Sequence, residues 1–280
     1  MTVAVVADSA SDLPEGSAER LGIHIVPLTI AVAGQDWLDG EELARERFWE
    51  LQAQQAALPQ TSAPSAGQFE AAFRDLLEAG ADGVVCVTLT RKLSATYQAA
   101  QTAARGFGSR VEVVDSETLT LTEGLIVEVA AEIARSGADL ATVVEATEHA
   151  KARARTRGTL DTLENLRRGG RIGAAAALLG TMMAFKPMIA IEDGEVKPAG
   201  RQRTRRRAVE DLVQWVGSLG LIERVGVVHA LAVDIAEVVE RVAAAVGRDP
   251  GAIEVSVMGA TIGTHAGPGA LGVSVLLAEG

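Results

Sequence analysis

Val3-Ala-Val-Val-Ala7, followed directly by Asp8-Ser-Ala-Ser-Asp12, sets the pattern of the first half of the chain. A short apolar run that ends in a polar turn is typical of a buried strand followed by a loop. The runs at 25–32, 84–89 and 111–114 have the same apolar character. Helical patterns occupy 41–55, 68–78, 97–105, 125–134 and 140–154. This alternation predicts a parallel sheet with helices on both faces.

The second half of the chain repeats this theme less regularly. Strands are expected at 225–229, 253–257 and 273–277, helices at 208–216 and 235–246, and a Lys-Pro step interrupts the run 178–191. At roughly 150 residues per domain, 280 residues correspond to about two domains. We therefore expect an α/β fold of two domains, 1–155 and 156–280. The first holds a parallel sheet flanked by helices, and the second is a mixed α/β domain.

Composition narrows the classes of function. Only 9 of the 280 residues are aromatic, so an apolar cavity must have mainly aliphatic walls, and a base-stacking surface is disfavoured. The net charge of −11 opposes binding to nucleic acid or to an anionic membrane. One cysteine and four scattered histidines do not form a common zinc site, so we expect no metal.

The sequence shows no pattern that predicts export or membrane insertion. The N-terminus has no basic segment before its first apolar run, so we expect no signal peptide. The longest apolar run, residues 172–185, is too short to span a bilayer. We expect a cytoplasmic protein that is not an integral membrane protein.

Hydroxyl-rich turns follow three of the expected strands, at 8–12, 88–97 and 115–118, and a further cluster at 61–65 precedes a helix. The carboxyl ends of parallel strands meet at one edge of a sheet, where ligands bind. Hydroxyl groups beside helix N-termini suit a small anion such as a carboxylate. Each turn alone is more often a helix cap, and Ser65 with Gln68 fits a capping box.

The glycine-rich segment 263–272 contains G-x-G-x-x-G, but a strand rather than a helix follows it, which excludes a dinucleotide site. We expect a tight turn that brings Thr264 and His265 against another surface. A loop histidine is usually structural, and beside hydroxyl groups it could donate to an anion. A hydrolase built on Ser94 and His265 is conceivable, although no acidic residue can be assigned to orient the histidine.

The segment 201–207 carries five arginines in seven positions. It is either a solvated turn before the helix at 208–216 or a docking site for an acidic or phosphate-bearing partner. Arg167, Arg168 and Arg171 could extend this patch, although sequence alone does not place them beside it.

Together these segments resemble the DegV family of bacterial proteins over almost the whole chain. The matching stretches are 6–13, 26–30, 61–65, 93–98, 114–116, 168–172, 186–187 and 264–269. The resemblance implies two α/β domains with a long-chain fatty acid, such as palmitate, buried between them, and no other cofactor. Several members are the binding subunit of fatty acid kinase. They present the carboxylate to a separate ATP-dependent catalytic subunit, which makes acyl phosphate for phospholipid synthesis.

The resemblance also implies site residues, none of them catalytic. The carboxylate-binding positions are Thr61, Ser62, Ser94, Thr264 and His265, and the kinase-docking positions are Arg171, Arg203 and Arg205. Ala95 departs from the family's usual glycine, which would shift the turn if that position has φ > 0.

The run 178–185, with Met182 and Met183, either lines a deformable acyl tunnel or is simply core. The alternative functions are the Ser94/His265 acyl-ester hydrolase, a binding module for another apolar ligand, and a regulatory protein that uses the arginines.

Overall fold

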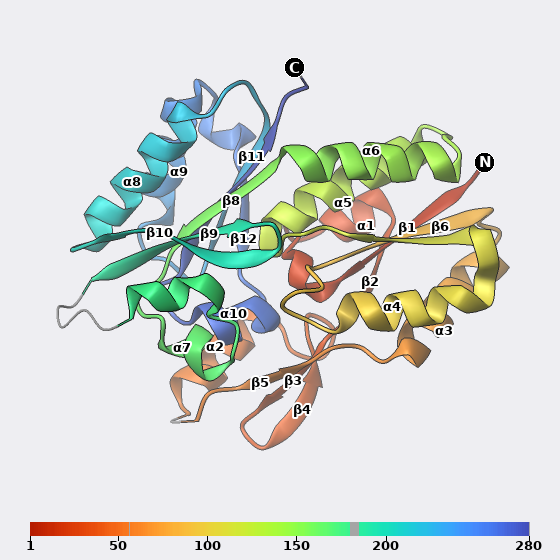
Figure 1. The fold of residues 1–280 in the computed structure, drawn as a ribbon, viewed down its shortest axis with the longest axis horizontal. Coiled ribbons are helices and arrows are strands. Elements are labelled where there is room, and N and C mark those ends of the chain that lie inside the picture. The colour runs from red at the N-terminus through yellow and green to blue at the C-terminus, as the bar shows by residue number, and fades with distance from the viewer. Residues whose placement is uncertain (56, 180–184, 280) are drawn as a thin grey trace.

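The first strand, β1 (Val3–Asp8), lies inside a four-stranded parallel sheet of order β2-β1-β6-β7. Its neighbours are β2 (Ile23–Val26), β6 (Gly83–Thr88) and β7 (Val111–Asp115). The computed structural model describes residues 1–55, 57–179 and 185–279 (Figure 1). Every residue of β6 is buried, as its continuous apolar run predicts for a strand covered on both faces.

Helices cover both faces of this sheet. Side chains on one face of the strands pack against α3 (Ala66–Glu78) and α4 (Thr96–Ala104). Alternate side chains pack against α5 (Thr120–Arg135) and α6 (Leu140–Arg153), with α1 (Ser17–Leu21) beside them. The expected parallel sheet flanked by helices is confirmed, and α3 begins with the expected capping box of Ser65 and Gln68.

The expectation of one strand over residues 25–32 is wrong. The chain breaks at Pro27, which has no N–H to continue a ladder. A separate strand, β3 (Thr29–Val32), then forms a small antiparallel sheet of order β4-β3-β5. Its other members are β4 (Gln35–Leu38) and β5 (Gln60–Ser62), joined by the segment that contains α2 (Arg45–Ala53).

The C-terminal part forms a six-stranded mixed sheet of order β10-β9-β8-β13-β11-β12. Its strands are β8 (Ala154–Thr159), β9 (Lys186–Glu192), β10 (Glu195–Gln202), β11 (Ile222–His229), β12 (Glu254–Val257) and β13 (Leu271–Leu277). Only β11 and β12 pair in parallel. One face packs against α8 (Arg205–Ser218) and α9 (Ile235–Val246). The domain boundary near residue 155 remains a prediction.

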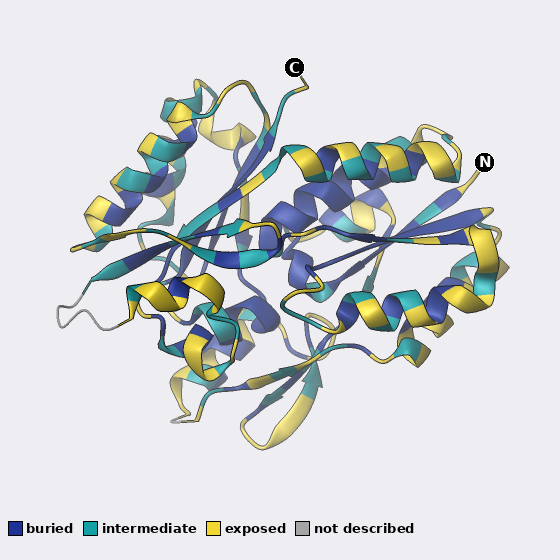
Figure 2. Ribbon diagram, viewed as in Figure 1, coloured by how far each residue is buried: buried dark blue, intermediate teal, exposed yellow. Residues whose placement is uncertain are grey.

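Helix α5 joins the two large sheets. It contacts β1 and β6 on one side and β8, β11 and β13 on the other. A buried chain of hydroxyl groups crosses this junction, because Thr122 donates to Ser274 (2.8 Å) and Thr156 donates to Thr122 (2.7 Å). Burial along most of α5 is visible in Figure 2.

Short elements complete the fold. They are the 3-10 turns at 9–11, 105–110, 173–178 and 250–252 and the helices α7 (Glu164–Arg168) and α10 (Ala260–Ala266). Among the helices of the described residues, none combines the length and the apolar character needed to cross a bilayer.

Candidate functional site

A largely apolar cavity of about 160 Å³ lies where the two large sheets and the small antiparallel sheet meet. Its walls are aliphatic on most sides, and polar groups enter from only a few residues. The aliphatic lining is Leu28, Ala63, Leu89, Leu93, Ala95, Leu119, Leu160, Leu166, Ile189, Ile191, Val196, Ile262 and Ala266. The polar lining is Thr61, Ser94, Arg171, Thr261 and His265.

The six-stranded sheet supplies one wall through strand alternation. Ile189 and Ile191 on β9 point to the same face, and Val196 on β10 lies opposite Ile191 in the ladder. Beside them on β8, Gly158 lies opposite Ile189 and Thr156 lies opposite Ile191. This face therefore presents aliphatic side chains to the cavity, as the composition predicts.

Thr61 and His265 meet at one part of the cavity wall. Thr61 Oγ1 on β5 lies 3.0 Å from His265 Nε2. The expectation of a loop position for His265 is wrong, because this residue is in the last turn of α10. The tight turn follows the helix. It contains Gly267 and Gly269, both with φ of +77°, and leads into β13.

His265 is held neutral and closely packed. Burial lowers the pKa of its imidazole to about 4, and the positive charge of Arg171 acts in the same direction. A Cβ at Gly169 would overlap His265 Nδ1, so the ring can sit here only because residue 169 has no side chain. A neutral imidazole can donate one hydrogen bond and accept another.

Ser94 lies in the turn between β6 and α4. Its Oγ is 2.8 Å from Thr96 Oγ1 and accepts from Thr96 N at 3.3 Å. The next residue, Ala95, has φ of −78°, so alanine in place of the family's glycine causes no backbone strain here. Among the described residues, His265 Nε2 contacts Thr61 and not Ser94, which differs from the nucleophile–base pair a hydrolase needs.

Arg171 lines the cavity, whereas the family resemblance implies a docking residue. Its Nε donates to the carbonyl oxygen of Leu93 (3.1 Å), and its Nη1 donates to that of Gly169 (2.6 Å). These two bonds fix a guanidinium among aliphatic side chains, beside Ser94 and His265 in the lining. Of the described residues that line the cavity, Arg171 is the one with a charged side chain, and its charge is positive.

Arg203 and Arg205 differ from each other. Arg203 is exposed and directly follows β10, which ends at Gln202. The guanidinium of Arg205 forms a two-bond ion pair with Asp234 (2.7 and 2.8 Å) and donates to the carbonyl oxygen of Gly269 (2.8 Å). Arg205 therefore anchors the start of α8 to the turn before β13, which makes a docking role unnecessary to explain it.

Two of the expected carboxylate-binding residues do not line the cavity. Ser62 is exposed, because successive side chains of β5 point to opposite faces and Thr61 faces inward. The hydroxyl of Thr264 donates to the carbonyl oxygen of Ala260 (2.8 Å) within α10. Met182 and Met183 lie outside the described residues.

Three buried aspartates, Asp8, Asp12 and Asp39, form a cluster that we call the carboxylate clamp. Asp8 accepts from Leu89 N (2.8 Å) and so ties the turn after β1 to the turn after β6. Asp12 accepts from Gly259 N (2.7 Å) and from the hydroxyl of Thr120 (2.6 Å). Burial raises the pKa of Asp8 to about 7 and that of Asp12 to about 6.

Asp39 holds the first turn of α10. Its carboxylate accepts from Ala260 N (3.1 Å), from Thr261 N (3.0 Å) and from the Thr261 hydroxyl (2.5 Å). The sequence did not predict this cluster. The turn that holds Asp8 and Asp12 was interpreted only as a possible helix cap or anion site, and no motif indicated a role for Asp39. The clamp fixes the helix whose other end carries His265.

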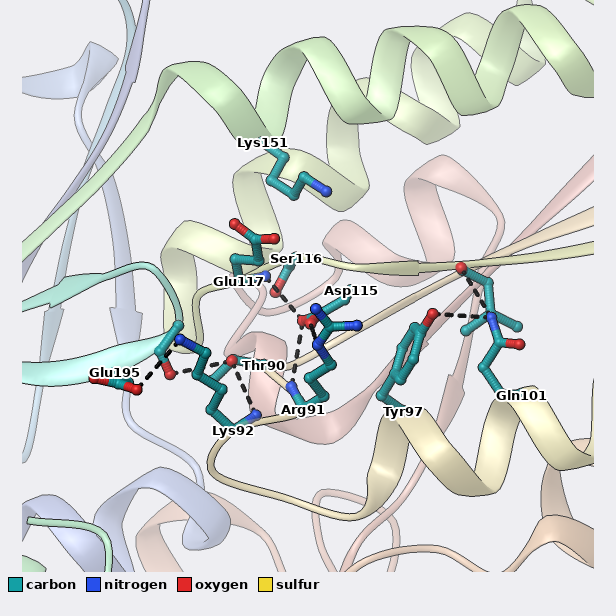
Figure 3. A network of polar contacts seen from close by, with 12 residues as sticks. Thr90, Arg91, Lys92, Tyr97, Gln101, Asp115, Ser116, Glu117, Lys151 and Glu195 are labelled. Atoms are coloured by element: carbon teal, nitrogen blue, oxygen red, sulfur yellow. Dashed lines mark hydrogen bonds and ion pairs between the residues drawn. The ribbon is translucent and has the colours of Figure 1, made fainter. Parts of the chain in front are cut away.

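A second set of polar contacts joins the loop after β6 to the hairpin of β9 and β10 (Figure 3). The Thr90 hydroxyl donates to the carbonyl oxygen of Gly194 (3.1 Å), and Lys92 pairs with Glu195 (3.2 Å). Next to them, Arg91 pairs with Asp115 (3.2 Å). Both joined segments line the cavity, so these contacts hold two of its walls together.

No metal centre accompanies this site: over 1–55, 57–179 and 185–279, no group of three or more histidine, cysteine or acidic side chains could hold an ion.

Comparisons with known proteins give the same family that the motifs indicate. The model of a family described as "Uncharacterised protein, DegV family" matches residues 2–278. A DegV domain-containing protein of Streptomyces coelicolor is 38% identical, with 98% of each chain covered. A solved Thermus thermophilus structure, described as "Fatty Acid Binding of a DegV family Protein", has a TM-score of 0.91 at 34% identity, covering 99% of this chain and all of that one.

A stearic acid-binding protein from Eubacterium ventriosum has a TM-score of 0.87 at 26% identity, covering 98% of this chain and 97% of that one. The two α/β parts of the present structure match these folds. This chain belongs to the DegV family.

Proposed function

We propose that this chain binds one long-chain fatty acid, such as palmitate, in the apolar cavity. The observation that carries the proposal is the composition of the cavity wall. The described lining is mostly aliphatic, and Thr61, Ser94, Arg171 and His265 supply hydroxyl groups, an imidazole and a positive charge, while the hydroxyl of the fifth polar residue, Thr261, is bonded to Asp39. We call these four residues the head-group cluster. They would hold the carboxylate, while the aliphatic wall holds the chain.

The energetics favour such a ligand. Burying a chain of about 16 carbons contributes on the order of 10 kcal/mol before the costs of binding, at roughly 0.8 kcal/mol per methylene. A buried carboxylate is expensive unless it is paired and hydrogen-bonded, and Arg171 meets that need. The cavity of about 160 Å³ is smaller than ligand pockets of roughly 300–1,000 Å³. Aliphatic side chains must therefore move apart when the chain enters.

We further propose that the bound fatty acid is presented in the cytoplasm to a separate kinase catalytic subunit. There a carboxylate oxygen attacks the γ-phosphorus of ATP, the bond between the β-γ bridging oxygen and that phosphorus breaks, and ADP leaves as acyl phosphate forms. The present chain contributes binding and orientation. The exposed Arg203 suits contact with an acidic or phosphate-bearing partner surface.

Native mass spectrometry of the purified chain tests the binding proposal. We expect one fatty acid per chain, released on extraction and taken up again when palmitate is added. Thr61→Ala and Ser94→Ala should each weaken retention roughly tenfold, the usual effect of losing one hydrogen bond to a charged group. Ser62→Ala is the matched control, because Ser62 is exposed on the neighbouring position of β5. A chain that is isolated empty and takes up no palmitate would contradict the proposal.

The docking proposal needs its own measurement. Arg203→Ala should leave fatty-acid retention unchanged and lower the rate at which a bacterial fatty acid kinase catalytic subunit consumes ATP with the loaded chain. Arg110→Ala, an exposed arginine just before β7, is the control for loss of surface charge. If Arg203→Ala empties the cavity, or leaves phosphorylation at the control level, Arg203 has no docking role.

A further inference from the structure

A groove of about 760 Å³ lies between two sheet edges and shares no lining residue with the apolar cavity. We call it the edge groove. Residues between 9 and 46 form one wall, which includes Ile25 of β2, and residues between 255 and 259 form the other, which includes the end of β12. In the described part of the chain, β2 pairs with β1 alone and β12 pairs with β11 alone. Such outermost strands leave one row of backbone groups without a strand partner, and an added segment can cover it.

Strand β12 lacks the usual protection of an outermost strand. Its four residues include no lysine and no proline, the residues that commonly block pairing at an edge. Val255 is 39% exposed and lines the groove. Within the groove, Arg45 is fixed because it donates to Ser256 Oγ (2.8 Å) and to the carbonyl oxygen of Leu13 (2.8 Å). The groove therefore offers an apolar contact at an open sheet edge, beside a cation that is already hydrogen-bonded.

The lining of the edge groove is strongly acidic. It contains five acidic residues and one basic residue, Arg45. Asp39 is buried in the carboxylate clamp, whereas the other four acidic residues are exposed, namely Glu15, Glu19, Glu41 and Glu46. Over the ranges that the structure describes, none of these four glutamates forms an ion pair. Four negative charges therefore face solvent along one groove.

Nearby arginines do not neutralise this charge. Arg20 pairs with Glu128 (3.6 Å) and Arg47 pairs with Glu50 (2.9 Å), and none of these four residues lines the groove. The negative potential of the groove therefore attracts a positively charged ligand and repels an acidic one.

We propose that the edge groove docks an extended basic segment of a partner protein, with lysine or arginine side chains on the four glutamates and an aliphatic side chain on Val255. The glutamates come from two segments, 15–19 and 41–46, and Val255 comes from the opposite wall. An extended chain with spaced cations can contact all three places together, whereas a single small cation does not. The inference is independent of the proposed fatty-acid function and goes beyond it. The surface at Arg203 suits an acidic partner, and the edge groove suits a basic one.

The test measures fluorescence anisotropy of a labelled ten-residue peptide that alternates lysine and alanine around one central valine. We expect the wild-type chain to bind this peptide and not its counterpart with glutamate in place of lysine. The combined variant Glu15→Gln, Glu19→Gln, Glu41→Gln and Glu46→Gln should bind roughly tenfold more weakly or worse, since four exposed ion pairs are lost. The matched control removes the same total charge from four exposed glutamates outside the groove and should change the affinity less than about twofold. Its substitutions are Glu78→Gln, Glu112→Gln, Glu145→Gln and Glu240→Gln.

A second variant tests the apolar contact at the sheet edge. Val255→Ser should weaken binding roughly threefold, because a buried methyl contact is lost. The salt dependence of binding should stay unchanged, since no charge is removed. Val233→Ser is the control, because Val233 is exposed in the loop before α9 and does not line the groove.

Each other outcome counts against the inference. Absence of lysine-peptide binding, or equal losses in the groove variant and the charge-matched control, would overturn it, because the second result is attraction by net charge alone. Spermine that binds as tightly as the peptide and displaces it would make the groove a site for small polyamines. A wild-type chain that self-associates in sedimentation experiments, and becomes monomeric in the groove variant, would make the occupant a second copy of this chain. Either of these last two results would overturn docking of a partner segment.

Discussion

The carboxylate clamp consists of buried polar side chains and the head-group cluster of half-buried ones. The two groups also differ in how many hydrogen bonds their atoms already make. In the clamp, Asp39 alone accepts from two backbone N–H groups and two hydroxyls. In the head-group cluster, Thr61 and His265 contact each other and face a cavity. Fully satisfied groups hold a structure together, whereas groups with spare capacity beside a cavity are available to a ligand.

Helix α10 connects these two regions. Its first turn is held by Asp39 and its last turn carries His265, only seven residues in all. A change in the clamp is therefore expected to affect stability first and binding second. A change at the head-group end should affect binding with a smaller cost in stability.

The largest expected effect follows from Asp39→Ala. The substitution leaves the N–H groups of Ala260 and Thr261 and the hydroxyl of Thr261 without their acceptor. We expect the free energy of unfolding to fall by roughly 3–5 kcal/mol, measured by urea denaturation. Asp36→Ala, an exposed position on β4, should change it by less than about 0.5 kcal/mol. Similar values for the two variants would show that the clamp does not stabilise α10.

A smaller loss of stability with a large loss of ligand is expected from Gly169→Ala. The new methyl group would overlap His265 Nδ1, so the imidazole must leave its place beside Thr61. We expect about 1–3 kcal/mol of destabilisation and a chain isolated largely without fatty acid. Gly106→Ala is the control, since nothing lies within 4 Å of a Cβ there. Normal fatty-acid occupancy in Gly169→Ala would mean that His265 does not position the carboxylate.

Local sequence patterns predict the parts of the fold that depend on local periodicity. The helix at 235–246 begins and ends where its apolar spacing predicts, and β6 follows its apolar run. Strand β8 escaped detection because Ala-Arg-Thr-Arg-Gly-Thr has no apolar alternation. Its strand character comes from two long-range neighbours, β9 and β13, which supply the ladder on either side.

In the candidate site, too, some residues could be predicted from local motifs and others depend on long-range contacts. Thr61, Ser94 and His265 could be proposed from motifs, and all three line the cavity. Ser62 adjoins Thr61 in the same motif, and only the existence of β5 decides which of the two faces inward. The place of Arg171 depends on bonds to Leu93, 78 positions away in sequence, and to Gly169. No local pattern carries such information, so the positive charge of the cavity could not be foreseen.

The smallest expected effect concerns Glu123 in the first turn of α5, a buried neighbour of the clamp. Burial raises the pKa of its carboxyl group well above the usual range, and the charges of Asp8, Asp12 and Asp115 add to this. The folded state therefore holds its proton at a pH where the unfolded state has lost it, so stability decreases as pH rises. Burial raises the pKa of Asp8 and of Glu254 to about 7, which acts in the same direction.

Glu123→Gln removes one titrating group and keeps the shape of the side chain. Between pH 6.5 and 8.5, a fully responsive carboxyl contributes a slope of up to about 1.4 kcal/mol per pH unit. We expect the variant to lose less stability than the wild-type chain over this interval and to be the more stable of the two at its upper end. Urea denaturation at each pH measures it, with Glu145→Gln on the exposed side of α6 as control. If the free energy of unfolding changes with pH in the same way for Glu123→Gln and the wild-type chain, Glu123 is already ionised in the folded state over this interval, despite its burial near Asp8 and Asp12.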